Sequence, residues 1–179
     1  MKFTKGYWMN LPGVTNTDAV QVREVKVEND RVYLYTVPYH ADMRAMGGPL
    51  LEMYISSPQP DIIRTEAYHF MGSNQKMPAF ELNDAHCALE VENTETTVTI
   101  KSGNTKLVIG KNPCSFDYYY KDKKLTSIGN RFGNAMISTI STPDGNYMRA
   151  QMNLDIGEKV YGLGERFTPY VKNGQTVET

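Results

Sequence analysis

The stretch that decides the fold is residues 96–128, TTVTIKSGNTKLVIGKNPCSFDYYYKDKKLTSI. Short runs rich in β-branched and aromatic residues alternate with small groups of polar, turn-forming residues, which is typical of strands joined by tight hairpins. Ser102-Gly103-Asn104 and Lys121-Asp122 tolerate the tight-turn and left-handed dihedrals that such connections need. Strands joined this closely pair antiparallel. The stretch therefore predicts four antiparallel strands, over Thr96–Lys101, Thr105–Ile109, Phe116–Tyr120 and Lys123–Ile128.

The same pattern continues on both sides of this stretch. Val20-Gln21-Val22 alternates, and the apolar phase then slips to Val25-Lys26-Val27. A slip of one residue within a strand predicts a β-bulge, here near Arg23-Glu24. Glu28-Asn29-Asp30 is a plausible turn into the next strand. The further expected strands are Arg31–Val37, Leu51–Ser56, Ile62–Phe70, Leu89–Glu92, Ala135–Ile140, Tyr147–Asn153 and Lys159–Gly162.

Evidence for helix is thin. Asp42–Met46 could form one turn before Gly47-Gly48-Pro49 breaks it. No segment keeps a 3.6-residue apolar period over three turns. The segments Asn10–Asp18 and Gly72–Pro78 are expected to be the loosest loops. The chain is therefore predicted to be all-β with minimal helix, with about ten to twelve strands in a large antiparallel β-sandwich.

The composition of the chain excludes several classes of function. The chain has 179 residues, which fit one domain, and a formal net charge of −1 without a basic stripe, so nucleic-acid binding is not expected. No apolar run of about 18 residues could span a membrane, and the N-terminus lacks a signal-peptide core. Two cysteines, Cys87 and Cys114, do not make a disulfide framework. The expected compartment is the cytoplasm, with an exported parent that has lost its start as the alternative.

The candidate sites for metal or cofactor chemistry are weak. His69, His86 and Cys87 match no ligand spacing, and neighbours on a strand would point to opposite faces. Gly162-Leu163-Gly164 lacks the third glycine and the following helix of a dinucleotide fingerprint. It is better explained as a sharp turn, with Glu165 and Arg166 pairing or bonding to backbone nearby. Neither a metal nor an organic cofactor is expected.

The residues that could act in catalysis form no specific motif either. The chain has 20 acidic residues, so a pair of carboxylates can always be nominated, and none lies in a context that indicates a shifted pKa. No Gly-x-Ser-x-Gly elbow is present. Tyr118-Tyr119-Tyr120 could form a sugar-stacking platform, although packing on both faces of a strand is the simpler interpretation. We expect no catalytic residue in this chain, and no substrate-binding residue can be named.

Several motifs together resemble one known family. Gly162-Leu163-Gly164-Glu165-Arg166-Phe167 resembles the motif that closes the N-terminal β-domain of glycoside hydrolase family 31. The continuation Val171–Glu178, VKNGQTVE, is similar to the α-xylosidase branch of that family. The resemblance covers essentially the whole chain. Its supporting pieces, in similar order, are Trp8 with Pro12-Gly13, Gln21–Val25, Ile63–Glu66 with His69-Phe70, and Ser102–Asn104.

The resemblance implies a fold and a role. Residues 1–165 would form a galactose-mutarotase-like supersandwich, and residues 166–179 would begin the segment leading to a catalytic TIM barrel. The family's nucleophile lies in a Trp-x-Asp-Met-Asn-Glu-like stretch, whereas Trp8, the single tryptophan, precedes Met9-Asn10-Leu11. The parent would be a retaining hydrolase of terminal α-linked xylose or glucose, working without a cofactor. This chain would be an inactive accessory domain that buttresses the barrel and helps to shape the sugar site.

Contact residues can also be nominated, and alternative functions stay open. Trp8, beside Tyr7, is expected to dock at a domain or subunit interface, because aromatics are enriched in interface cores. Glu165, Arg166 and Asn173 are further interface candidates. Such a domain would expose an apolar surface that its barrel normally covers, and the parent would assemble as a homo-oligomer. The alternatives are a free-standing carbohydrate-binding module and a sugar mutarotase, which needs an acid and a base across the ring.

Overall fold

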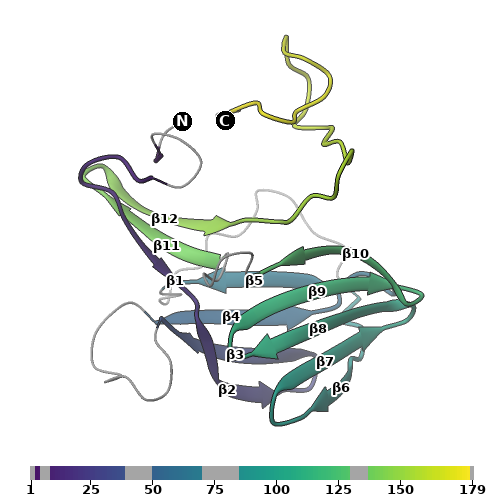
Figure 1. The fold of residues 1–179 in the computed structure, drawn as a ribbon. Coiled ribbons are helices and arrows are strands. Elements are labelled where there is room, and N and C mark those ends of the chain that lie inside the picture. The colour runs from purple at the N-terminus through teal and green to yellow at the C-terminus, as the bar shows by residue number, and fades with distance from the viewer. Residues whose placement is uncertain (1–2, 5–8, 39–49, 70–84, 130–136, 178–179) are drawn as a thin grey trace.

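The structure is a computed structural model that describes residues 3–4, 9–38, 50–69, 85–129 and 137–177. Within these ranges the chain forms twelve β-strands in three antiparallel sheets and no helix (Figure 1). The predicted all-β sandwich is confirmed. The expected helical turn Asp42–Met46 and the expected loop Gly72–Pro78 lie outside the described residues.

The deciding stretch forms most of a five-stranded sheet with the order β10-β9-β8-β7-β6. Each strand pairs antiparallel with its chain neighbour, so the sheet is a simple meander and the four predicted strands are confirmed, with ends that differ by a few residues. The bounds of the strands are β6 Glu90–Asn93, β7 Thr97–Ser102, β8 Thr105–Lys111, β9 Cys114–Tyr120 and β10 Lys123–Ile128.

The turn between β7 and β8 shows why the sequence places a glycine there. Gly103 has φ +56°, and a Cβ at this position would lie 2.2 Å from Oδ1 of Asp61. The same Oδ1 accepts a hydrogen bond from the Asn104 amide, and the Asp61 carbonyl accepts one from Oγ1 of Thr105 at 2.6 Å. Asp61 precedes β5 of the other layer, so this turn also ties the two layers together.

The second layer is a four-stranded sheet with the order β2-β3-β4-β5. The pairing of β2 with β3 shifts register between Val22 and Glu24, which confirms the β-bulge that the apolar phase slip predicts. The predicted bounds of β3 and β4 are those observed, whereas β5 is shorter than expected. The strands are β2 Gln21–Val27, β3 Arg31–Val37, β4 Leu51–Ser56 and β5 Arg64–Tyr68.

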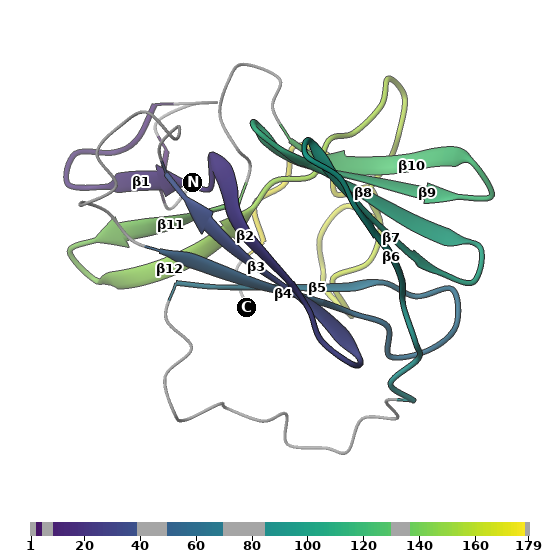
Figure 2. The ribbon, with the colours of Figure 1, turned by 90° about the horizontal axis from the view of Figure 1, so that it is seen from below.

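The core lies between these two sheets, which face one another in Figures 1 and 2. Alternate residues of each strand point inward, as the period of two requires. The four-stranded sheet contributes Val32, Leu34, Met53 and Ile55, and the five-stranded sheet contributes Val98, Ile100, Leu107, Ile109 and Phe116. All of these side chains are at most 1% exposed. Burying each one stabilises the fold by roughly 1.5–3 kcal/mol.

A third sheet of order β1-β11-β12 flanks the sandwich, with β1 at Thr15–Asp18, β11 at Ile137–Thr142 and β12 at Gly145–Ala150. Two sequence predictions fail here. The sequence predicts a loose loop over Asn10–Asp18, yet this segment contains β1, which pairs with β11 far along the chain. The sequence predicts a strand over Lys159–Gly162, but no strand follows β12 in the described residues.

Candidate functional site

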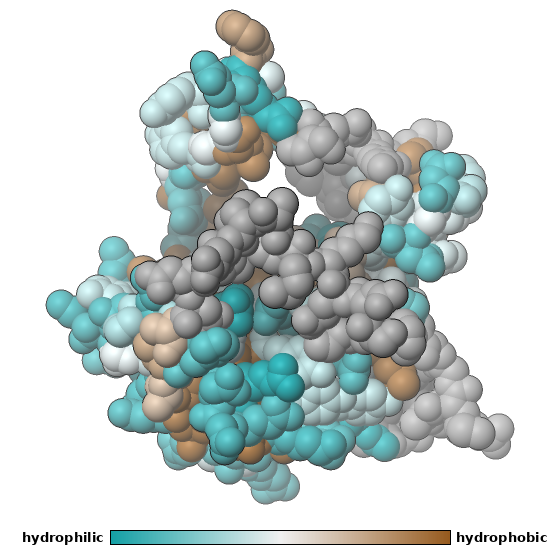
Figure 3. Space-filling view, turned by 180° about the vertical axis from the view of Figure 1, so that it is seen from behind, coloured by the Kyte–Doolittle hydropathy of each residue, from teal (hydrophilic) through white to brown (hydrophobic). Residues whose placement is uncertain are grey.

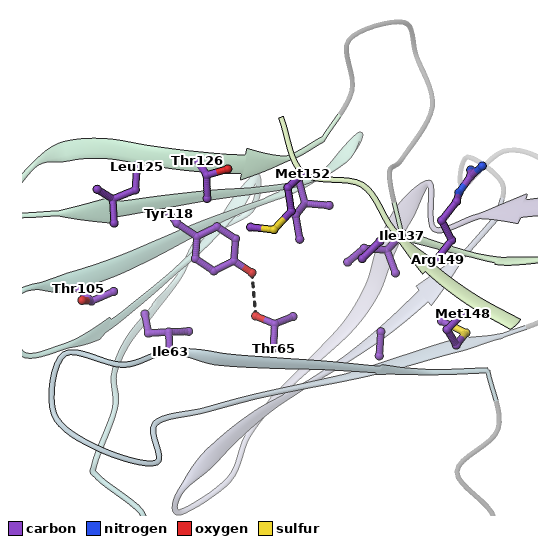
Figure 4. A pocket seen from close by; sticks show the side chains of 13 residues that line it. Ile63, Thr65, Thr105, Tyr118, Leu125, Thr126, Ile137, Met148, Arg149 and Met152 are labelled. Atoms are coloured by element: carbon purple, nitrogen blue, oxygen red, sulfur yellow. Dashed lines mark hydrogen bonds between the residues drawn. The ribbon is translucent and has the colours of Figure 1, made fainter. Parts of the chain in front are cut away.

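A pocket opens where the three sheets meet (Figure 4). Its volume is about 600 Å³. Its lining comes from β5 and the residue before it, from β8, β9 and β10, and from β11, β12 and the residues just after it. Ile63, Ala67, Leu125, Ile137 and Met152 make most of its wall apolar. No single strand supplies the site, so it exists only because the third sheet closes against the open side of the sandwich.

A bulge in β10 shapes one wall of this pocket. The pairing of β10 with β9 skips a residue, because Lys124 pairs with Tyr119 and Thr126 pairs with Tyr118. Leu125 is the extra residue, and an extra residue in one strand re-aims its side chain. Leu125 is half-exposed and lines the pocket, as Figure 4 shows.

One hydrogen bond crosses the pocket from one layer to the other. Oη of Tyr118 on β9 lies 2.9 Å from Oγ1 of Thr65 on β5 (Figure 4). Burial of the ring raises the pKa of Tyr118, and the bond to Thr65 opposes part of that rise. This bond satisfies two hydroxyls that the apolar lining would otherwise leave without a partner.

The pocket holds no pair of groups for acid–base catalysis among the residues that line it in the described structure. Among the described lining residues, the one ionisable side chain besides Tyr118 is Arg149, which points away from the pocket (Figure 4). Nε of Arg149 donates to Oγ of Ser138 at 2.9 Å, and Nη2 donates to Oδ1 of Asp18 at 3.2 Å. The described lining residues include neither a carboxylate nor a histidine. The arrangement suits an apolar group and not glycoside hydrolysis.

After β12 the chain leaves the sheets as an arm, which we define as residues 151–177. The arm extends beyond β5 and β10, edge strands of the two layers (Figures 1 and 2). Asn153 anchors its base to β10: its amide donates to the Ser127 carbonyl at 2.8 Å, and its carbonyl accepts from Oγ1 of Thr126 at 3.1 Å. The arm therefore starts at the rim of the pocket, where Met152 belongs to both.

The far part of the arm is held together by two side chains that the sequence does not single out as structural. Lys172 is buried, and its Nζ donates to Oγ1 of Thr168 at 2.6 Å and to the Pro169 carbonyl at 2.8 Å. Asn173 accepts from the Val160 amide at 2.8 Å and donates to the Glu158 carbonyl at 2.9 Å. The Lys172 amide also donates to the Val160 carbonyl, so two distant stretches of the arm are bound to each other.

The predicted interface residues lie in this arm, apart from Trp8, which is outside the described residues. The expected sharp turn is confirmed, because Gly162, Leu163 and Gly164 all have positive φ. Nε of Arg166 donates to the Leu163 carbonyl at 2.9 Å, as expected for a side chain that supports the turn. Glu165, Arg166 and Asn173 are all exposed. Their interface role stays a prediction.

The outer face of the four-stranded sheet carries a row of aromatic rings. Tyr33 and Tyr54 are 5.3 Å apart with ring planes tilted by 54°, and Tyr54 and Tyr68 are 6.1 Å apart with a tilt of 68°. The guanidinium of Arg31 lies over the ring of Tyr54 at 4.6 Å, and Nζ of Lys26 lies over that of Tyr33 at 5.4 Å. Tilted and cation-capped rings are a poor platform for a flat sugar face.

Other kinds of site find little support in the described ranges. His69 is exposed, and Nδ1 of His86 pairs with Oδ2 of Asp30 at 3.3 Å on the surface, so neither lines the pocket. No three His, Cys, Asp or Glu side chains in these ranges are grouped so that they could hold a metal ion. Within the same ranges, no helix is suited to crossing a membrane.

Comparison with known proteins identifies relatives of this chain. The family model described as "Glycosyl hydrolase 31 N-terminal galactose mutarotase-like domain" matches residues 52–179. The chain is 30% identical to alpha-xylosidase XylQ of Lactiplantibacillus pentosus, over 100% of this chain and 24% of that protein. It is also 30% identical to an alpha-xylosidase of Emericella nidulans, over 99% of this chain and 25% of that protein. The chain thus spans about a quarter of the length of these curated relatives.

Two solved structures share the fold. The cycloalternan-forming enzyme of Listeria monocytogenes superposes with a TM-score of 0.65 at 18% identity, over 92% of this chain and 14% of that one. The GH31 dextranase of Flavobacterium johnsoniae superposes with a TM-score of 0.65 at 14% identity, over 89% of this chain and 18% of that one. At such low identity the likeness concerns the fold alone.

Proposed function

Because the chain belongs to the glycosyl hydrolase 31 N-terminal galactose mutarotase-like domain family, we propose that it is the non-catalytic N-terminal domain of a retaining α-glycosidase. The domain buttresses a catalytic TIM barrel and helps to shape its sugar site. The observation that carries this proposal is the 30% identity to two alpha-xylosidases over essentially the whole of this chain. The same match covers only 24% and 25% of the two alpha-xylosidases. The preferred substrate is therefore terminal α-linked xylose, with α-linked glucose as the second choice.

The chemistry is then located outside this chain. Retaining glycosidases need two carboxyl groups about 5–5.5 Å apart, one acting as nucleophile and one as acid and base. The apolar pocket offers no such pair among its lining residues, which supports an accessory role for this domain. That mechanism requires neither metal nor organic cofactor. Residues 1–165 would be the sandwich domain, residues 166–179 would begin the segment that leads to the barrel, and the enzyme would act in the cytoplasm as a homo-oligomer.

Activity assays on the full-length protein and on residues 1–179 test this proposal. The full-length protein should release p-nitrophenol from its α-xyloside, with retention of configuration by NMR, while the 179-residue chain should release none. Titration of the short chain with α-xylosides and xylo-oligosaccharides should show no binding at millimolar concentration. Turnover by the short chain, or a full-length protein inactive on both α-xylosides and α-glucosides, would contradict the proposal. Millimolar binding would instead favour a carbohydrate-binding module.

A further inference from the structure

The hairpin between β11 and β12 carries the one Asp-Gly pair of the chain, Asp144-Gly145. Pro143 and Asp144 form its two-residue tip, because Thr142 pairs with Gly145 at the ends of the two strands. The tip projects from the third sheet, away from the two layers of the sandwich (Figure 1). Seen from behind, this part of the surface is mostly hydrophilic (Figure 3, upper right). Asp144 and Gly145 are both exposed, so the pair lies in contact with water.

The turn holds the backbone of Asp144 and leaves its carboxyl group without a partner. Oγ1 of Thr142 accepts a hydrogen bond from the Asp144 amide at 3.2 Å and donates one to the Gly145 carbonyl at 3.0 Å. Within the described part of the chain, the Asp144 carboxyl makes neither a hydrogen bond nor an ion pair. The side chain is therefore free to rotate towards the peptide that follows it.

The residue after Asp144 leaves the approach to that carboxyl open. Glycine has no Cβ to crowd its own amide nitrogen. The space around Gly145 is also empty, since even an added Cβ would meet nothing within 4 Å. The amide nitrogen of Gly145 can thus reach Cγ of Asp144 without a steric obstacle from the rest of the fold.

We propose that Asp144 is a site of spontaneous isomerisation to isoaspartate. The Gly145 amide nitrogen bonds to Cγ of Asp144, and the carboxyl hydroxyl leaves with the amide proton as water, which gives a five-membered succinimide. Water then opens this ring. Hydrolysis of the new Cγ–N bond restores aspartate, whereas hydrolysis of the original C–N bond leaves the main chain running through Cβ and Cγ. The reaction consumes no oxidant or partner, and it does not depend on the proposed function.

The isomer has a direct consequence for the third sheet. It adds one atom to the main chain within a turn whose length sets the register of β11 on β12. β11 contributes the four consecutive buried residues Ile137–Ile140, and β12 contributes Met148 and Ala150 to the wall of the apolar pocket. Isoaspartate at the tip should therefore loosen both strands and the pocket wall that they form.

Ageing the folded full-length protein at physiological temperature tests the proposal. Isoaspartate is located in chymotryptic peptides by electron-transfer fragmentation and counted by methylation with an isoaspartate-specific carboxyl methyltransferase. Asp122 is the internal control, because it also lies in a hairpin tip, but its carboxylate pairs with Nζ of Lys106 at 3.1 Å and a lysine follows it. Isoaspartate should build up at Asp144 while Asp122 stays unmodified. Asp144→Glu keeps the carboxyl but requires a six-membered ring, so it should not isomerise.

Three results would overturn the proposal or its consequence. If Asp144 stays intact in the folded protein but isomerises in a denatured sample aged in parallel, the native hairpin protects the pair. Equal build-up at Asp122 and Asp144 would show that neither the free carboxyl nor the glycine decides the reaction. Amide hydrogen exchange in β11 and β12 should be faster in the aged protein than in aged Asp144→Glu, and equal rates in a sample that contains the isomer would refute the loosening.

Discussion

The hydrogen bond across the pocket gives a quantitative test of how the layers are joined. The hydroxyls of Tyr118 and Thr65 lie 2.9 Å apart, and they come from β9 and β5 of opposing sheets. A neutral hydrogen bond contributes about 0.5–1.5 kcal/mol, and removing one partner leaves the other hydroxyl poorly solvated. Tyr118→Phe and Thr65→Val should therefore each lower the free energy of unfolding by about 1–2 kcal/mol. In a domain of this size each loss lowers the Tm by roughly 2–8 °C.

The double variant isolates the bond itself. If the two hydroxyls interact, Tyr118→Phe with Thr65→Val should cost less than the sum of the single changes, by a coupling of about 1 kcal/mol. Urea unfolding of the 179-residue chain, with unchanged m-values, gives the four free energies. Tyr119→Phe is the control, because Tyr119 lies on the opposite face of β9 against Lys106, and it should cost under about 0.5 kcal/mol. Additive single changes would refute the view that this bond joins the layers.

Two further predictions concern the core and a turn. Burial raises the pKa of the Cys114 thiol from its ordinary 9.0 to about 12, so its contribution to stability is complete below pH 9 and is lost as the pH rises from 9 towards 12. Unfolding free energies from pH 8 to 11 should fall more steeply in the parent chain than in Cys114→Ala, and equal slopes would contradict this. Gly103→Ala should cost more than about 1 kcal/mol, because a Cβ meets Asp61 while φ is +56°. Gly174→Ala is the control, because its φ of +72° is similar but nothing lies within 4 Å of the added Cβ, and a smaller loss at 103 than at 174 would contradict the clash. Chemical denaturation measures both glycine variants.

The sequence predicts the meander and its details because those features are local. A period of two in the apolar residues, with turn residues between the runs, specifies antiparallel hairpins within a few residues of chain. The bulge near Arg23-Glu24 is visible in the same way, as a slip in the apolar phase. The turn after β7 is likewise predicted from its Ser-Gly-Asn sequence. The close approach of Asp61, which explains why a glycine is needed there, cannot be predicted from the sequence.

The misses concern segments and side chains whose partners are supplied only by the folded chain. Thr15–Asp18 carries no apolar alternation, and it becomes a strand because Ile137–Thr142 supplies its hydrogen bonds. The Lys159–Gly162 segment has strand-like residues, but no strand among the described residues pairs with it, so it joins the arm and bonds to Asn173 instead. Burial of Lys172 is equally invisible in the sequence, since a lysine is normally exposed and only the turn around it supplies acceptors.

By itself, the sequence determined the fold class, the antiparallel meander, the bulge in β2 and the membership of a family, because each depends on patterns within short stretches of chain. Only the tertiary structure decided which surfaces meet. It brought β5, β9, β10 and β12 together around an apolar pocket and joined Tyr118 to Thr65 across it. It also turned Phe167 and Tyr170 outward on an ordered arm. Such contacts depend on how whole sheets pack against each other, and no local periodicity records that choice.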